Sequence, residues 1–310
     1  MSASEMNPVV VAVGHDPIDA ALRFAAAEAR RNGCGLHLVH ALRRQHDGPE
    51  SILVTMSDRE FVGRQALEAA RERARDYLGE ELRLSAEILH GPVVSAVVSG
   101  AAEARMIVLE HRDLSTLRRV MTRSTASGVA ARARVPVVSV PARWDPDAEQ
   151  PAERTVVVGI DIPDRSEQIL RVAAQQARSR GAILRVIHTW SLPAPYEDLV
   201  VTRTEDDRWG ERANAEIKAV IESLGAEASG VEVRVETVHA PAPDALIAAS
   251  REAELLVVGR HDPVVPFGSH LGPVARAVLN ETACPILLAD PRPVLRWGRL
   301  AEDVAQQAGV

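Results

Sequence analysis

The chain contains an internal repeat, and this repeat limits its possible folds more than any other feature. The segment that begins at Val9 matches the segment that begins at Val156. Later landmarks recur in the same order, because His90-Gly91-Pro92 corresponds to His239-Ala240-Pro241. The 310 residues also exceed the usual size of a single domain. We therefore predict two fused copies of one domain of about 150 residues.

A short stretch between the copies differs from both in composition. Its sequence, PARWDPDAEQPAER, is rich in proline and charge, which is typical of a linker. Apolar positions near the end of the chain suit one face of an amphipathic helix that docks on the body or on a partner. We place the first domain at 1–142, the linker at 143–153, the second domain at 154–290 and a C-terminal tail at 291–310.

Within each copy, short apolar runs rich in Val, Ile and Leu alternate with longer segments of helical period. The runs are continuously apolar, as in Val9–Val13, which is typical of strands covered on both faces of a parallel sheet. Gly33 and Gly181 lie where helices are expected to end. The predicted class is α/β. Strands are predicted near 8–14, 35–40, 84–89, 105–110, 135–140, 154–161, 182–189, 231–238, 254–259 and 284–289.

The composition excludes several classes of function. With 46% hydrophobic residues, 25% charged residues and a net charge of -7, it is typical of a soluble globular protein. The chain lacks the broad basic field that gives affinity for nucleic acid, so neither nucleic acid nor a membrane surface is expected as a partner. Met1–Pro8 has no basic flank of a signal peptide, so we expect a cytoplasmic protein. The two cysteines, Cys34 and Cys284, lie in different copies and are expected to be buried and unbridged.

Further motifs follow the strands in the same order in both copies. The second strand carries LHLVHA or LRVIHTW, the third is followed by HGPV or HAPAPDAL, and the last carries VPVV or CPILL. This arrangement resembles a tandem universal stress protein over about nine-tenths of the chain. The resemblance implies two Rossmann-like domains of the adenine nucleotide alpha hydrolase type, each a five-stranded parallel sheet flanked by helices. Many members of that family bind ATP where the strand order reverses, as is general for open α/β sheets.

The family's ATP signature is an aspartate after the first strand and Gly-x2-Gly-x9-Gly-Ser/Thr after the fourth. The glycines let the backbone approach the phosphates, and the last pair opens a helix whose free N–H groups face the anion. In the second copy Asp161 matches the aspartate, and Gly259 and Gly272 match two of the glycines. By this resemblance the nucleotide, accompanied by Mg²⁺, is held by Asp161, Thr189, Gly259, Asp262, Gly272, Pro273 and Val274.

Two positions of the second copy depart from the signature. Asp262 replaces a glycine and brings a carboxylate close to the expected phosphates. Pro273 replaces the hydroxyl residue and removes a backbone donor. The first copy departs further, with Gly14 at the aspartate position and Glu110 at the first glycine, so we expect no intact phosphate site there. ATP binding is therefore expected to be weak and confined to the second copy.

Each candidate residue also has a purely structural explanation. An aspartate after a strand often caps the next helix, which is the alternative role of Asp161. Gly259 and Gly272 suit a strand end and a helix start for conformational reasons, and Pro273 is preformed for a first helical turn. Asp262 suits a loop cap as well as a magnesium or phosphate contact. The spacing therefore argues common ancestry more strongly than present activity.

The sequence contains no catalytic constellation that we can identify. His40 and His188 end the second strand of each copy, but no Cys, Asp or Glu stands near them at ligand spacing, so we expect packing or a hydrogen bond. The chain has no Gly-x4-Gly-Lys-Ser/Thr loop and no Gly-x-Ser-x-Gly elbow. An enzyme that hydrolyses ATP needs a general base that the sequence does not offer, so we predict that the protein is not an enzyme.

Two functions follow from this pattern. The first is a non-catalytic stress-response module that binds an adenine nucleotide weakly in its second copy and acts on an unidentified protein partner. The alternative is a nucleotide-free interaction scaffold whose ATP motif has decayed. In both, we expect the two copies to pack as an internal pseudo-dimer through the edge that single-domain homodimers would use. A homodimer of the whole chain is compatible with either function.

Overall fold

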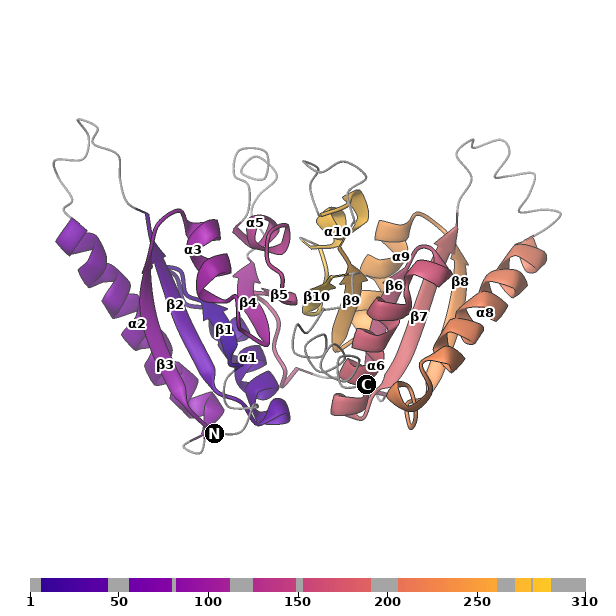
Figure 1. Ribbon diagram of the computed structural model, residues 1–310, viewed down its shortest axis with the longest axis horizontal. Coiled ribbons are helices and arrows are strands. Elements are labelled where there is room, and N and C mark those ends of the chain that lie inside the picture. Colours follow the sequence, from indigo (N-terminus) through magenta and orange to yellow (C-terminus); the bar gives the residue numbers. More distant parts are fainter. Residues whose placement is uncertain are drawn as a thin grey trace, which may run out of the picture.

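The computed structural model describes residues 7–43, 56–79, 82–111, 125–148, 153–190, 206–260, 271–279 and 281–290. These residues form a ten-stranded sheet with helices on both faces (Figure 1). The α/β class expected from the sequence is therefore confirmed. No helix among these ranges is long and apolar enough to cross a membrane.

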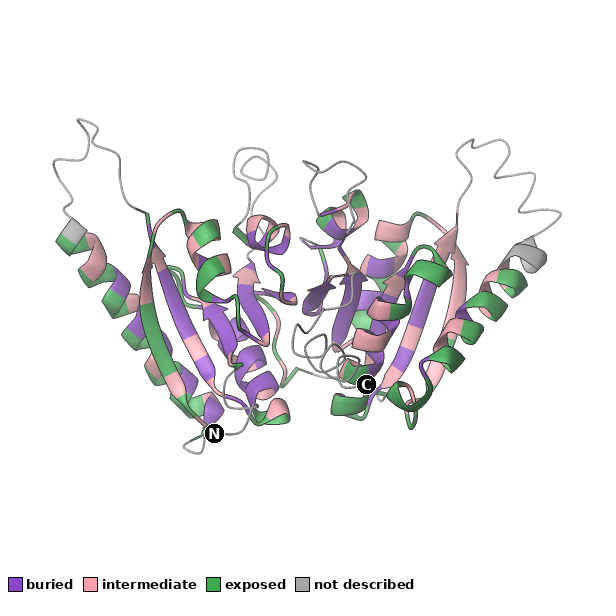
Figure 2. Cartoon of the chain, in the orientation of Figure 1, coloured by how far each residue is buried: buried purple, intermediate pink, exposed green. Residues whose placement is uncertain are grey.

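All ten strands lie within two residues of the predicted boundaries. The apolar runs are continuous because both faces of the sheet are covered, and the central strands are almost fully buried (Figure 2). The first half contains β1 (Val9–Ala12), β2 (Leu36–Leu42), β3 (Leu84–His90), β4 (Met106–His111) and β5 (Val137–Pro141). The second half contains β6 (Thr155–Ile160), β7 (Ile183–Trp190), β8 (Val233–His239), β9 (Leu255–Gly259) and β10 (Ile286–Ala289).

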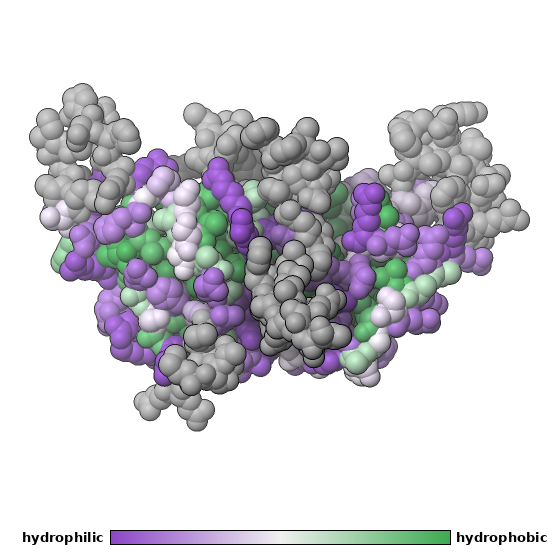
Figure 3. Space-filling model, in the orientation of Figure 1, coloured by the Kyte–Doolittle hydropathy of each residue, from purple (hydrophilic) through white to green (hydrophobic). Residues whose placement is uncertain are grey.

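Helices cover the sheet in the same way in both halves. The first half has α1 (Asp19–Asn32), α2 (Met56–Leu78), α3 (Val93–Gly100) and α5 (Thr125–Ala130). The second half has α6 (Glu167–Arg180), α8 (Asp206–Ser223), α9 (Ala242–Ala249) and α10 (Pro273–Val278), with the short 3-10 helices η3 (Pro163–Arg165), η4 (Gly225–Glu227) and η5 (Ser250–Glu252). One apolar layer lies under α1, α2, α6 and α8, and the other lies under α3, α5, α9 and α10. Outside these layers, hydrophilic residues line the lower rim of the described surface (Figure 3).

The strand order explains where a ligand can enter. The sheet runs β3-β2-β1-β4-β5-β10-β9-β6-β7-β8, so the order along the chain reverses between β1 and β4 and again between β6 and β9. Both of these pairs are parallel. A reversal leaves a crevice beyond the carboxyl ends of the two strands, because the connections depart in opposite directions. By this rule each half has one position where such a crevice is expected, between β1 and β4 and between β6 and β9.

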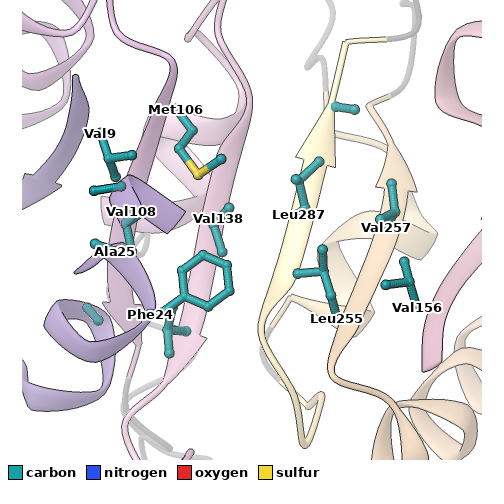
Figure 4. Close-up of a cluster of buried hydrophobic side chains, with 14 of the residues drawn as sticks. Val9, Phe24, Ala25, Met106, Val108, Val138, Val156, Leu255, Val257 and Leu287 are labelled. Atoms are coloured by element: carbon teal, nitrogen blue, oxygen red, sulfur yellow. The ribbon is translucent and has the colours of Figure 1, made fainter. Parts of the chain in front are cut away.

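The halves join edge to edge through β5 and β10. Of the described strand pairs, this one alone runs antiparallel, with Leu287 opposite Val138 and Ile286 opposite Ser139. The apolar core continues across the joint, where Val138 faces Leu287 and Phe24 packs beside Val138 (Figure 4). The two copies thus pack as the internal pseudo-dimer that the repeat predicts.

Two sequence details have their expected structural role. Gly33 and Gly181 end α1 and α6 with φ angles of 59° and 60°, a left-handed conformation that side chains with a Cβ disfavour. Cys34 and Cys284 are both buried and free, as expected. Burial raises the pKa of both thiols, that of Cys284 to about 12.

Candidate functional site

Three of the candidate residues meet at the carboxyl edge of the second half. Asp161 directly follows β6, Thr189 is the second-last residue of β7, and Gly259 ends β9. The register of β6 and β7 places Asp161 level with Thr189, which is half-buried. The register of β6 and β9 places Gly259 level with Ile160, the residue before Asp161. These three residues therefore surround the crevice between β6 and β9.

The carboxylate of Asp161 is not engaged by the protein. Asp161 is exposed and makes no hydrogen bond or ion pair with the described residues. The N-cap residue of η3 is Ile162 and that of α6 is Ser166, and neither helix has a side-chain cap. Asp161 therefore does not cap a helix, and the alternative role raised by the sequence is not realised. Its neighbour Ile162 is a large apolar side chain that is 46% exposed.

Gly259 has a packing role of its own. A Cβ at this position would lie 3.2 Å from Cγ1 and 3.3 Å from Cδ1 of Ile169 in α6. Such contacts are tighter than ordinary van der Waals contacts, so a side chain would require Ile169 to shift by a few tenths of an ångström. The φ angle of Gly259 is not positive, so the reason for this glycine within the protein is close packing and not the conformational freedom considered from the sequence.

The helix α10 opens as the sequence predicts. Gly272 is its N-cap residue and Pro273 takes the first helical position, with the N–H of Arg276 bonded to the Gly272 carbonyl at 3.0 Å. Because proline has no N–H, Val274 and Ala275 supply the remaining donors of the first turn. Asp262, the other altered residue of the signature, lies outside the described residues.

Arg260 follows Gly259 but points away from the crevice. One nitrogen of its guanidinium donates to the carbonyl oxygen of Ala130 at 3.1 Å and to that of Ala133. The other pairs with Asp290 at 3.1 Å. The side chain is buried in the joint between the halves, where it caps the carboxyl end of α5. The guanidinium of Arg260 is therefore committed to the joint between the halves and is not available to a phosphate group at the crevice.

The equivalent edge of the first half carries a different side chain. Glu110 occupies the position that Gly259 has in the second half, and its Oε2 accepts a hydrogen bond from the N–H of Ala21 at 3.2 Å. Ala21 lies in the first turn of α1, whose N-cap residue Ile18 has no side chain able to cap. A carboxylate at a helix N-terminus is stabilised by the free N–H groups and the helix dipole. The donors that an anion would need in the first half are thus partly occupied by the protein itself.

The sequence contained a signal for this role of Glu110, since a long acidic side chain replaces the glycine and the following helix lacks a polar N-cap residue. The hydrogen bonds of Arg260 could not be predicted from the sequence, because their acceptors, Ala130 and Ala133, belong to the other half.

The histidines at the strand ends make the hydrogen bonds that were expected. Nδ1 of His40 lies 2.9 Å from the carbonyl oxygen of Val13, and Nδ1 of His188 lies 3.4 Å from that of Ile160. Burial lowers the pKa of His40, and the edge-on ring of His15, at 5.1 Å, adds to this effect. Within the described ranges, no group of three or more His, Cys, Asp or Glu residues could hold a metal ion.

Comparison with known proteins gives the same assignment at three levels. The profile of the Universal stress protein family matches residues 6–141 and 153–290. A curated universal stress protein of Mycobacterium tuberculosis is 30% identical over 92% of this chain and 97% of its own length. The crystal structure of a universal stress protein from Archaeoglobus fulgidus matches 93% of this chain and 98% of its own with a TM-score of 0.63, at 16% identity, which shows the shared fold.

A second solved universal stress protein of Archaeoglobus fulgidus, in complex with dAMP, matches 43% of this chain and 96% of its own at 26% identity, with a TM-score of 0.33. The family profile itself covers both halves of the chain, including all ten strands. The chain belongs to the universal stress protein family.

Proposed function

We propose that the protein is a non-catalytic, cytoplasmic regulatory module that binds an adenine nucleotide weakly at the carboxyl edge of its second half. The observation that carries this proposal is the meeting of Asp161, Thr189 and Gly259 at the crevice between β6 and β9, with the Asp161 carboxylate exposed and unengaged. Ligands of open α/β sheets bind at this kind of position.

The nucleoside end of the ligand has suitable partners. The two oxygens of Asp161 accept hydrogen bonds, which suits ribose hydroxyls, and the hydroxyl of Thr189 can donate or accept. The exposed side chain of Ile162 offers an apolar surface for a flat adenine ring. Gly259 presents backbone without a side chain at the point where the ligand would cross β9.

The phosphate end is poorly supported, which is why we propose weak binding of ATP. Pro273 removes one N–H from the first turn of α10, and that helix is only six residues long. Arg260 is committed to the joint between the halves. In the family's signature the position of Asp262 belongs to the phosphate-binding loop, so its charge would disfavour ATP without Mg²⁺, for which a carboxylate is a suitable ligand.

A specific observation favours the alternative, a nucleotide-free scaffold. Gly259 suits the close approach of Ile169, and Pro273 suits the first helical position, so both residues have a role without a ligand. In that case the fold that the two halves share would serve only a protein partner or a homodimer of the chain.

Nucleotide released by acid from the purified protein, followed by NMR titration of ATP with and without Mg²⁺, tests the two functions. We expect Asp161→Asn to weaken ATP binding at the carboxyl edge at least tenfold, because one hydrogen bond to a charged group contributes about 1.5 kcal/mol or more. Asp164→Asn, an exposed aspartate in η3, is the matched control and should leave affinity unchanged. Absence of any binding, or equal effects of both variants, would favour the scaffold. Turnover of ATP would contradict the non-catalytic assignment.

A further inference from the structure

A cavity lies between the two halves, at the opposite edge of the sheet from the proposed nucleotide site. Its volume is about 670 Å³. It is bounded by α1 and the end of α2 on one side, and by the residues just before β6, β9 and β10 on the other (Figure 1). Residues 143–148, which follow β5, form a third wall. Cavities of this size hold small-molecule ligands.

The lining of this cavity is basic, although the chain as a whole is acidic. Among the described residues that line it, seven are arginines and four are carboxylates. The whole chain has a net charge of -7, so a local excess of positive charge is not a consequence of composition. Arginine binds phosphate groups through paired N–H donors, and arginines grouped in a cavity favour a multivalent anion.

Arginines from both halves remain available at the rim. Arg251 of η5 is exposed and makes no hydrogen bond or ion pair with the described residues. Arg30 of α1 is exposed and donates one nitrogen to the carbonyl oxygen of Tyr77, which leaves its other nitrogens for a ligand. Arg23 pairs with Asp145 and Asp147 at 3.0 and 2.9 Å, but both of these carboxylates are largely exposed. Such exposed pairs contribute little and exchange readily for a stronger anion.

Several positively charged side chains lie close together at the floor of the cavity. Arg180 is buried there and pairs with Glu28, which also accepts from Arg31. Burial lowers the pKa of Arg180; the charge of Glu28 opposes this shift, and repulsion from Arg31 and Arg154 adds to it. Arg154 is itself paired with Glu254 at 2.6 Å, so three guanidinium groups interact here with two carboxylates, Glu28 and Glu254. An anion at this position would relieve the repulsion.

Aromatic residues, which are rare in the chain, gather at the same place. The chain has four tryptophans, two tyrosines and three phenylalanines, and one of each lines the cavity. Trp144 packs edge-on against Phe24 with ring centroids 5.8 Å apart, and the guanidinium of Arg23 lies 5.3 Å from the Tyr77 ring centroid. The Tyr77 ring thus supports the guanidinium of Arg23, and the aromatic rings add apolar surface to the cavity wall.

We propose that this inter-half cavity binds a ligand that carries a polyphosphate chain, held by Arg30 of the first half and Arg251 of the second. Inorganic polyphosphates and nucleoside polyphosphates both contain a row of linked phosphates, and this row is the part that the arginines would bind. The ligand bridges α1 and η5, so its binding stabilises the joint between the halves. This site is independent of the carboxyl edge and does not require the proposed nucleotide site.

Titration calorimetry of the full chain with sodium tripolyphosphate tests the proposal. We expect one site per chain, and Arg30→Glu and Arg251→Glu should each weaken binding at least tenfold. Arg132→Glu changes the charge equally at an exposed arginine outside the cavity and should change affinity less than twofold. Circular dichroism of each variant verifies that it is folded, and Arg30→Gln provides a milder substitution if Arg30→Glu is not.

Three outcomes would overturn the proposal: no binding of tripolyphosphate at low ionic strength, equal losses in all charge variants, or binding that Arg30→Glu and Arg251→Glu leave unchanged. Titrations with ATP and with adenosine separate the two sources of the ligand. Tighter binding of ATP than of tripolyphosphate, lost in Arg251→Glu, identifies a nucleoside polyphosphate. Equal affinity for both identifies the phosphate chain alone.

Discussion

The buried ion pair between Glu28 of α1 and Arg180 of α6 gives a quantitative test of how the halves are held together. Nη2 of Arg180 lies 2.5 Å from Oε1 of Glu28, and the two side chains are 2% and 1% exposed. Arg31 reaches the same oxygen at 2.6 Å from a partly exposed position. Arg180→Met keeps an unbranched apolar stem but removes the guanidinium and its charge, so Glu28 stays buried with one cation in place of two. Breaking a buried pair in this way costs about 3–5 kcal/mol.

Removing both charges of this pair should lower the free energy of unfolding much less than removing one of them. At the position equivalent to Glu28, the second half has Gln176, so Glu28→Gln introduces a side chain that the same kind of helix already accommodates. Replacing a buried ion pair by neutral residues of similar volume is often neutral. We therefore expect the double variant to regain at least about 2 kcal/mol relative to Arg180→Met.

Urea unfolding, followed by circular dichroism and tryptophan fluorescence, measures these differences. Arg132→Met, at an exposed arginine of the first half, is the control and should change the free energy of unfolding by less than about 0.5 kcal/mol. If Arg180→Met lowered the free energy of unfolding by less than about 1 kcal/mol, the reasoning would be refuted, because the buried pair would then stabilise the protein no more than a surface salt bridge does. Additive losses in the double variant would refute it as well.

Three further predictions follow from the site and the core. Asp262→Gly with Pro273→Ser removes a carboxylate and restores an N–H, so ATP affinity should rise at least tenfold, about 1.4 kcal/mol; an unchanged affinity by titration would reject this account of the loop. Because burial raises the pKa of Cys284 to about 12, its thiol should resist iodoacetamide at pH 8 in the folded protein and react after unfolding, as mass spectrometry of the labelled peptide can show. Burial lowers the pKa of His40 below its ordinary value of about 6.5, so the unfolded state binds the proton more readily. The free energy of unfolding should therefore fall as the pH falls below about 6.5, and less steeply in His40→Asn, when urea unfolding at pH 7 and pH 5 is compared.

The fold could be predicted almost completely from the sequence because its signals are local or repeated. Ten apolar runs marked ten strands, and Gly33 and Gly181 marked two helix ends, since each depends on only a few neighbouring residues. The repeat also supplied the joint between the halves, because two copies of one domain tend to share an edge.

The site was less predictable because its residues act through neighbours that are distant in sequence. Spacing placed Asp161 and Gly259 at one edge, but it did not show that Gly259 must accommodate Ile169 of α6. The direction of Arg260 was undetermined, because its acceptors include Ala130 of the other half. Whether Asp161 capped a helix depended on where η3 begins, a boundary that sequence rarely fixes to within one residue.

The antiparallel pairing of β5 with β10 has a consequence for stoichiometry. In an assembly of separate identical chains, a change at one carboxyl edge is copied to the other, and the two edges cannot take different roles. Here the partners across the joint are encoded separately, so Glu110 closes one edge while Gly259 at the matching position leaves the other without a side chain. Every molecule therefore carries one edge with Glu110 and one edge with Gly259. Two edges of the same type never pair across this joint, as they would in a mixture of separate chains.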